Sequence, residues 1–156
     1  MQAINAGFLT QDEALTLVDR YFDPVNSYSH SNVMFTPFNQ YFLVRALFSL
    51  GGGGGSGGGG SGNRTYPVTA AYSALRACWG GQLDYGATTF FEVFSPFWLS
   101  MIKKNGPVPN GQSGYTSLCH PWAAGIAPLL TEFSLGVKTR EPGFRSWTFR
   151  PQFPPR

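Results

Sequence analysis

The run from Gly51 to Gly62 constrains the fold more than any other part of the chain, because it consists of ten glycines and two serines. It has no side chain larger than serine, so it can add nothing to a hydrophobic core and gains nothing by ordering. Its near-repeat of four or five glycines and a serine is the pattern of an engineered flexible linker; a natural glycine-rich loop is the alternative. Such a chain reaches roughly 19 Å, which suits a connection between two neighbouring helices.

The linker divides the chain into segments. We expect a helical hairpin segment over 1–50, the linker over 51–62, a second helical segment over 63–136 and a tail over 137–156. Among the 156 residues, 42% are apolar and only 12% are charged, against about 25% charged in an ordinary soluble domain. A core is therefore well supplied, and part of the surface is expected to be buried against something else.

The distribution of charge and the shortness of the apolar runs argue against nucleic-acid and membrane partners. Residues 138–156 hold five Lys or Arg and one Glu, which leaves six cations and seven anions in residues 1–137. Cations confined to a proline-rich tail argue against a nucleic-acid partner. No apolar run approaches the roughly 18 residues of a membrane-spanning helix, and no basic signal-peptide start is present, so no membrane partner is predicted. Extracellular and cytoplasmic locations both stay open.

Helical signals dominate before the linker. Thr10 and Glu13 form a capping-box pattern, in which each side chain can satisfy a backbone N–H at the start of a helix. Pro24 is expected to end that helix. Pro37 fits the first position of a second helix, which is apolar on more than one face and should therefore be buried on most sides.

Helical signals continue after the linker. Pro67 is expected to open a helix that ends at Gly80–Gly81, and a last helix is expected over 121–135, with Gly136 just after its end. Residues 137–149 are expected to be a loop with one strand that lacks a visible partner. The predicted fold class is all-α, with four or five helices in successive hairpins and a short irregular or β-like tail.

Glu92 is the candidate catalytic residue. Five of the nine residues from Phe90 to Trp98 are aromatic, and Glu92 is the one ionisable group among them. Desolvation favours the neutral form of a carboxyl group, which is one way to prepare an acid/base residue. The alternative is a carboxylate at the rim of the fold, hydrogen-bonded to a neighbouring N–H.

Further candidates lie near loop ends. His120 and Trp122 precede or begin the last helix, and Trp98 closes the aromatic segment; these are residues that can line a sugar pocket, or equally act as structural anchors. Asp84 is a weaker candidate, which a helix cap or Asx turn also explains. Cys78 and Cys119 lack metal-ligand spacing and leave the redox compartment open, and neither a metal nor a cofactor is predicted.

Two segments resemble a known family. The segment Gly86–Glu92, GATTFFE, resembles the G-A-T-T-x-x-E segment of the α-L-rhamnosidases of glycoside hydrolase family 78. The segment Ser117–Gly125, SLCHPWAAG, together with the short stretches at 135–137 and 142–144, resembles the last helices of the same catalytic domain and its exit to a β-domain. The similarity covers 66–100 and 114–150 well and the first 50 residues loosely.

The resemblance implies a fold and a site. The family's catalytic domain is an (α/α)₆ barrel of twelve helices, so this chain would be about half of one. Glu92 would correspond to the general base of an inverting mechanism, His120 and Trp122 would line the sugar pocket, and Asp84 would lie at its rim. The general acid comes from the missing half, so the isolated chain is expected to have little or no activity on terminal L-rhamnosides, and to self-associate or bind that half.

Three alternatives stay open. The chain is either such a base-bearing piece or a minimised helical module with at most a carbohydrate-binding or assembly role. It can also be an excerpt of a larger enzyme, with the linker in place of omitted residues. Other (α/α)₆ glycosidases, such as trehalase-like or glucoamylase-like enzymes, are an alternative at the level of the fold.

Overall fold

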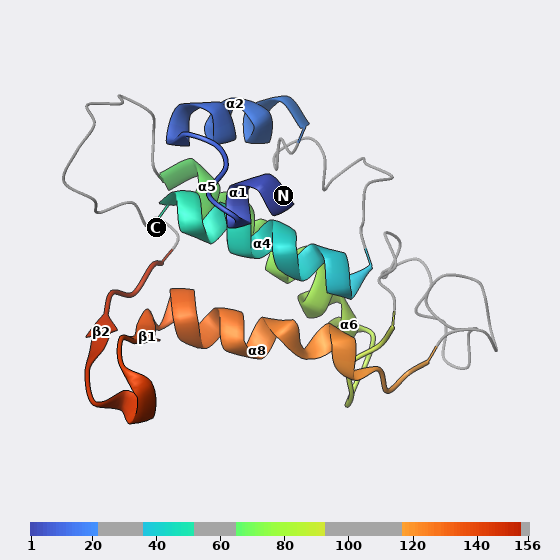
Figure 1. Cartoon of the computed structure of the whole chain (residues 1–156). Coiled ribbons are helices and arrows are strands. Elements are labelled where there is room, and N and C mark those ends of the chain that lie inside the picture. Colours follow the sequence, from blue (N-terminus) through green and yellow to red (C-terminus); the bar gives the residue numbers. More distant parts are fainter. Residues whose placement is uncertain (22–35, 52–64, 93–116, 154–156) are drawn as a thin grey trace.

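The computed structural model describes residues 1–21, 36–51, 65–92 and 117–153. This part of the chain is mostly helical and ends in a small antiparallel sheet (Figure 1). In chain order the elements are α1 (Gln2–Asn5), α2 (Gln11–Tyr21), α4 (Pro37–Gly51), α5 (Thr65–Leu75), the π-helical turn η1 (Arg76–Gly80), α6 (Gly81–Asp84), the 3₁₀ turn η2 (Pro121–Gly125), α8 (Ile126–Leu129), the π-helical turn η3 (Leu130–Ser134), β1 (Val137–Thr139), the 3₁₀ turn η4 (Pro142–Phe144) and β2 (Trp147–Phe149).

Helix α2 begins as the sequence predicts. The Thr10 N–H donates to Glu13 Oε2 at 2.9 Å, and the Glu13 N–H donates to Thr10 Oγ1 at 3.3 Å, so the reciprocal capping box is formed. Pro24, the predicted end of this helix, lies outside the described residues, as do linker residues 52–64. Gly51, expected to start the linker, is instead the last residue of α4.

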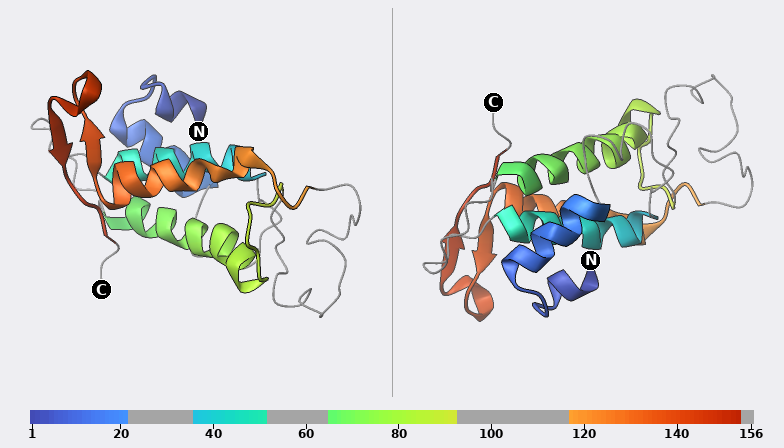
Figure 2. Two further views of the ribbon diagram at one scale, coloured as in Figure 1. Left: turned by 90° about the horizontal axis from the view of Figure 1, so that it is seen from below. Right: turned by 90° about the horizontal axis from the view of Figure 1, so that it is seen from above.

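Helix α4 lies at the centre of the fold. It lies between the short helices α1 and α2 on one side and the η2–α8–η3 run on the other, and α5 runs along it (Figures 1 and 2). Pro37 is its first residue, as predicted, because a proline there loses no helical hydrogen bond. Its apolar residues point in several directions, and most are covered, although Phe38 is 46% exposed. The buried ones are Pro37, Leu43, Val44, Ala46, Leu47, Phe48 and Leu50.

Aromatic packing joins α4 to its neighbours. The ring of Phe48 stacks on that of Phe133 at 5.4 Å between centroids and meets Tyr72 edge-on at 5.4 Å. The Tyr72 hydroxyl reaches past this contact to Ser134 Oγ at 2.6 Å and donates to the Gln152 carbonyl at 2.8 Å. These contacts therefore tie α4, α5 and η3 together at one end of the molecule.

The prediction that a helix ends at Gly80–Gly81 is wrong. Both glycines have right-handed helical backbone angles, and the helical run continues from α5 through η1 and α6 to Asp84. A glycine permits a helix end but does not impose one. Here the buried side chains of Trp79 and Gln82 on either side of the pair are reasons for the run to continue.

The prediction of a lone strand in the tail is also wrong. Strands β1 and β2 pair antiparallel, with Val137 opposite Phe149 and Thr139 opposite Trp147, so each half of the stretch is the other's partner. Gly136 ends the preceding helical run with φ +72°, as its predicted position requires. A Cβ atom there would lie 2.0 Å from the backbone of Arg150, so only glycine fits.

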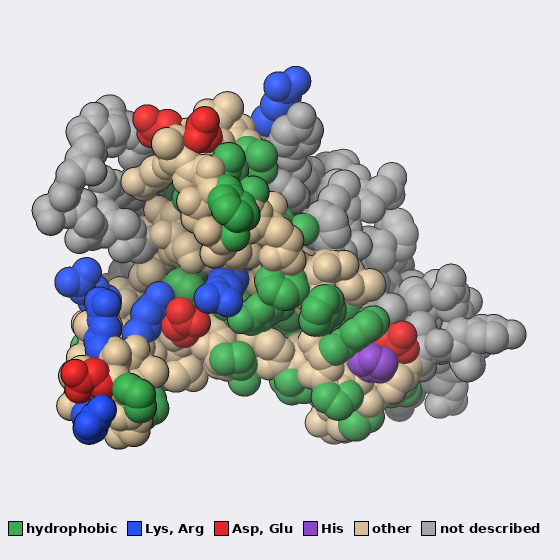
Figure 3. Space-filling view, viewed as in Figure 1, with side chains coloured by type: hydrophobic (Ala, Val, Ile, Leu, Met, Phe, Trp, Pro, Cys, Tyr) green, Lys and Arg blue, Asp and Glu red, His purple; other side chains and the backbone are tan. Residues whose placement is uncertain are grey.

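Many large apolar side chains stay exposed on this small fold. Their exposed fractions range from 36% at Phe90 to 82% at Phe8, and Figure 3 shows such side chains spread over one face. Trp122 and Leu130 lie on the η2–α8–η3 run, Phe144, Trp147 and Phe149 lie on the hairpin of β1 and β2, and the others are spread over the fold. Within the described residues no helix is long and apolar enough to cross a membrane.

Candidate functional site

Two segments 25 residues apart in the sequence lie side by side at one end of the fold. The Glu92 N–H donates to the Ser117 carbonyl at 2.9 Å, and the His120 N–H donates to the Phe90 carbonyl at 2.7 Å. The Thr89 hydroxyl also donates to the Leu118 carbonyl. These bonds follow the order of an antiparallel pair, so they hold the segments Gly86–Glu92 and Ser117–Gly125 in one register.

Glu92, His120 and Trp122 come together at this pairing. Glu92 Oε2 lies 3.9 Å from His120 Nδ1, which is an ion pair when the imidazole is protonated and too long for a hydrogen bond. The rings of His120 and Trp122 have centroids 4.4 Å apart. The Trp122 indole N–H donates to the Glu92 backbone carbonyl at 3.3 Å. We call these three residues the Glu–His–Trp cluster.

The carboxylate of Glu92 is neither deeply buried nor free. Its side chain is 27% exposed, and Oε2 accepts the Ser117 N–H at 2.8 Å. This is the alternative environment that the sequence left open, a carboxylate bonded to a neighbouring N–H. The hydrogen bond from Ser117 fixes the position of Oε2 and so defines the orientation of the Glu92 carboxylate.

Two buried side chains hold both segments in place through hydrogen bonds to their backbones. The Gln82 amide, 3% exposed, accepts the Phe91 N–H at 3.3 Å and donates to the Phe91 carbonyl at 3.5 Å, which fixes the segment before Glu92. The Trp79 indole donates to the Ala123 carbonyl at 2.9 Å, which fixes the start of the helical run behind His120. Trp79 precedes Gly80–Gly81 and Gln82 follows it, so both anchors lie on the continuous helical run of η1 and α6.

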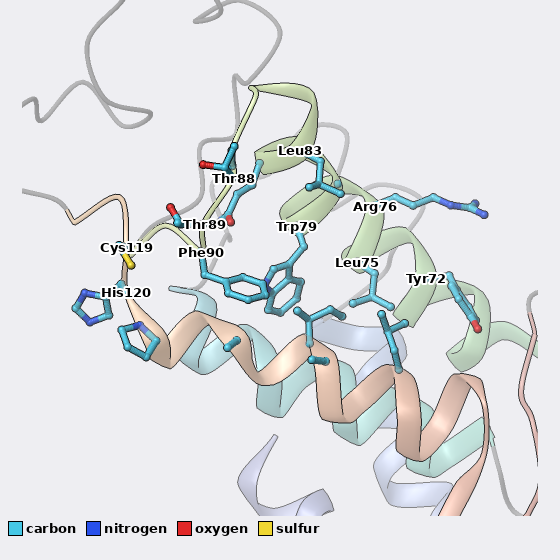
Figure 4. Close-up of a pocket in the computed structure, with 18 residues that line it drawn as sticks. Tyr72, Leu75, Arg76, Trp79, Leu83, Thr88, Thr89, Phe90, Cys119 and His120 are labelled. Atoms are coloured by element: carbon cyan, nitrogen blue, oxygen red, sulfur yellow. The ribbon is translucent and has the colours of Figure 1, made fainter.

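A groove of about 860 Å³ adjoins the cluster (Figure 4). It runs between the α5–η1–α6 run and the η2–α8–η3 run. At one end lie Thr88, Thr89, Cys119 and His120, whereas the centre is apolar and contains Leu75, Trp79 and Phe90. Neither Glu92 nor Trp122 is among the residues that line it, so His120 is the cluster residue that it shares.

The remaining predicted site residues are not brought to the cluster by any described contact. Asp84 is exposed at the end of α6 and does not line the groove. Trp98 lies outside the described residues. Within the described residues no group of three or more His, Cys, Asp or Glu side chains could hold a metal ion.

Sequence reasoning did not single out Thr89, Ser117 or Gln82. Ser117 and Thr89 lie inside the two segments with the resemblance, which was the available signal for them. Gln82 gave no signal, because a lone glutamine near a helix end is ordinary surface composition.

Comparison of the chain with protein-family models, curated proteins and solved structures finds no match. The resemblance to the rhamnosidases therefore stays a prediction that depends on the two short segments.

Proposed function

We propose that this chain supplies the general-base side of a glycosidase site for terminal α-L-rhamnosides, and that its helices correspond to half of an (α/α)₆ barrel. One observation supports the proposal above the others. Two segments that resemble glycoside hydrolase family 78 pair in space and bring a carboxylate, an imidazole and an indole together.

In this proposal Glu92 is the base. Oε2 already accepts the Ser117 N–H, so Oε1 takes the proton from a water whose oxygen attacks the anomeric carbon. Trp122, 43% exposed, offers an aromatic face to the C–H groups of the sugar, and the His120 imidazole hydrogen-bonds a sugar hydroxyl. The configuration at the anomeric carbon is inverted.

The reaction also needs an acid. In an inverting enzyme a second carboxyl group, about 6.5–9.5 Å from the base, protonates the leaving oxygen. The sequence offers no segment that matches this acid, so in the proposal another polypeptide supplies it. Loss of the acid costs roughly 10²–10⁴-fold in rate for ordinary glycosides.

An activated substrate tests the base alone. Nitrophenolate leaves without protonation, so p-nitrophenyl α-L-rhamnoside bypasses the missing acid. We expect slow nitrophenolate release by the intact chain, reduced about 10²-fold or more by Glu92→Gln and unchanged by the matched control Glu132→Gln. Glu132 is a carboxylate on η3 paired with Lys138. Release that Glu92→Gln leaves unchanged, or no release by a folded chain, would contradict the proposal.

The groove favours a second candidate, an assembly module. Phe90, Leu83 and Leu130 line the groove and are 36%, 71% and 39% exposed, which leaves apolar surface for another helix to cover. Sedimentation of the chain tests this candidate. Self-association that Leu130→Lys abolishes and Phe8→Lys preserves supports it, since Phe8 is exposed but does not line the groove.

A further inference from the structure

The hairpin of β1 and β2 has two different faces. Directly opposed residues share a face, so Trp147 and Phe149 lie on one face and Lys138 lies on the other. Lys138 Nζ lies 3.9 Å from the centre of the Phe133 ring and 3.3 Å from Glu132, which turns its face toward η3. Trp147 and Phe149 therefore point outward, and they are 56% and 61% exposed.

The tip of the hairpin adds a third exposed ring. Phe144 has φ +55°, a left-handed conformation that a bulky L-residue rarely adopts, and its side chain is 61% exposed. A conformation of this kind has an energetic cost that no apolar burial of Phe144 offsets. Backbone outliers of this kind are common at functional surfaces, so we infer that the exposed ring of Phe144 contacts a partner.

Cations lie on the same hairpin as these rings. By the same alternation Arg140 and Arg150 lie on the face of Lys138, at the ends of the paired strands, and Arg145 follows Phe144 at the tip. Arg140, Arg145 and Arg150 are all exposed, and no ion pair involves them within the described part of the chain. The one anion between them is Glu141, also exposed. Figure 3 shows several blue side chains at this end of the molecule and others elsewhere on the same face. We call these six exposed residues, which lie on both faces and at the tip of the hairpin, the aromatic–arginine surface; they are Arg140, Phe144, Arg145, Trp147, Phe149 and Arg150.

We propose that the aromatic–arginine surface binds peripherally to an anionic lipid surface. Aromatic rings favour the headgroup level of a bilayer, and guanidinium groups are attracted to anionic lipids, at about fivefold in affinity for each cation near the surface. The net positive charge of the exposed groups complements such a surface. The hairpin also projects from the helical body (Figures 1 and 2), as a lipid contact requires, whereas single-stranded nucleic acid favours a positively charged groove.

The proposal is independent of the glycosidase proposal. The sequence led us to expect no membrane partner because no segment is long enough to span a bilayer. A peripheral contact needs no spanning segment, since a few exposed rings and cations suffice for reversible binding.

Vesicle sedimentation of the full chain tests the lipid contact. The two vesicle types are pure phosphatidylcholine and phosphatidylcholine with about 30 mol% phosphatidylserine. We expect binding to the anionic vesicles and at least about tenfold weaker binding to the neutral ones. The double variant R145Q/R150Q should lose about 25-fold in affinity, whereas R20Q/R76Q, with the same net charge, should bind as the parent does.

The rings have their own control. The variant F144A/F149A should lose binding, whereas F8A/L83A, which removes two exposed apolar side chains elsewhere, should not. Circular dichroism before each assay confirms that the variants are folded. Equal losses in the paired variants, equal binding to both vesicle types, or no binding would overturn the proposal. Binding of fluorescent oligothymidine that depends on Arg145 and Arg150, without vesicle binding, would assign the surface to nucleic acid instead.

Discussion

Aromatic side chains meet opposite environments in the α4 core and on the hairpin. Phe48 is fully buried and packs between Phe133 and Tyr72, whereas Phe149 is 61% exposed on β2. The apolar content of this chain therefore does not show how many of its apolar side chains are buried in the core. Helices that surround α4 bury one set of rings. The outer face of the two-stranded sheet stays open, because no second layer from the described part of the chain covers it.

The two cysteines give the largest expected contrast between buried and exposed positions. Cys78 is fully buried on η1, and burial raises the pKa of its thiol to about 12, whereas Cys119 is exposed. With a typical free energy of unfolding of at least about 5 kcal/mol, we expect Ellman's reagent to label Cys78 more than about 10³-fold more slowly than Cys119. The ratio of labelling rates in Cys78→Ala and Cys119→Ala variants measures this contrast.

The same thiol gives a pH dependence. The folded pKa of Cys78 lies above its ordinary value of 9.0, so the folded chain holds the proton more tightly than the unfolded one. Its contribution to stability is fully present below pH 9 and is lost as the pH rises toward about 12. Urea unfolding across this window should show a decline that Cys78→Ala reduces; equal declines would contradict the burial of Cys78.

Truncation of a buried and of an exposed phenylalanine should give the next largest difference, in the free energy of unfolding. Phe48→Ala should lower the free energy of unfolding by about 3–5 kcal/mol, because it removes buried contacts and leaves a cavity. Phe149→Ala should change it by no more than about 0.5 kcal/mol. Chemical denaturation of both variants measures the difference. Similar losses would mean that the outer face of the hairpin is covered in solution.

Two glycines with φ +72° allow the cost of backbone strain to be measured apart from the cost of steric crowding. Gly7→Ala should cost about 1–2 kcal/mol from strain alone, because nothing lies within 4 Å of a Cβ atom there. Gly136→Ala should cost more than about 2 kcal/mol, because its Cβ would overlap the backbone of Arg150. Thermal or urea unfolding compares the two, and a smaller loss at Gly136 would argue against the close approach of the hairpin.

The capping box gives the smallest effect. Thr10→Ala should cost about 1 kcal/mol, whereas Thr16→Ala, within the same helix, should cost less than about 0.5 kcal/mol. The backbone N–H and the hydroxyl of Thr10 lower the pKa of Glu13 below its usual 4.5. That stabilising contribution is present at neutral pH and is lost as the pH falls below 4.5. Thr10→Ala should reduce this acid decline only in part in urea unfolding, because the backbone N–H that contributes most is kept.

Local signals predicted several starts and ends of helices, although α5 begins at Thr65 and not at the expected Pro67. Thr10 with Glu13, Pro37 and Gly136 each act through one or two neighbouring residues, so their effect can be inferred without knowledge of the rest of the fold. The helix end expected at Gly80–Gly81 and the lone strand were wrong for a common reason. Both depend on contacts with distant parts of the chain, such as those of Trp79 with Ala123 and of β2 with β1.

The candidate site was predictable to a similar degree. The sequence singled out Glu92, His120 and Trp122, and the structure brings these three together. It gave no indication of the groove, because residues from α5, α6 and the η2–α8–η3 run line it and none of them is unusual alone. The hydrogen bond from Ser117 to Glu92 is likewise a matter of register between two distant segments.

The attachment of the hairpin has a mechanical consequence. The Arg150 N–H donates to the Gly136 carbonyl, and the Gln152 N–H donates to the carbonyls of Phe133 and Ser134, so both legs of the hairpin are fastened to one helix end. The Tyr72 hydroxyl donates to the Gln152 carbonyl and so fastens the leg that follows β2 to α5. The hairpin is thus attached to two helical elements, η3 and α5, so a force on its tip would act on both of them.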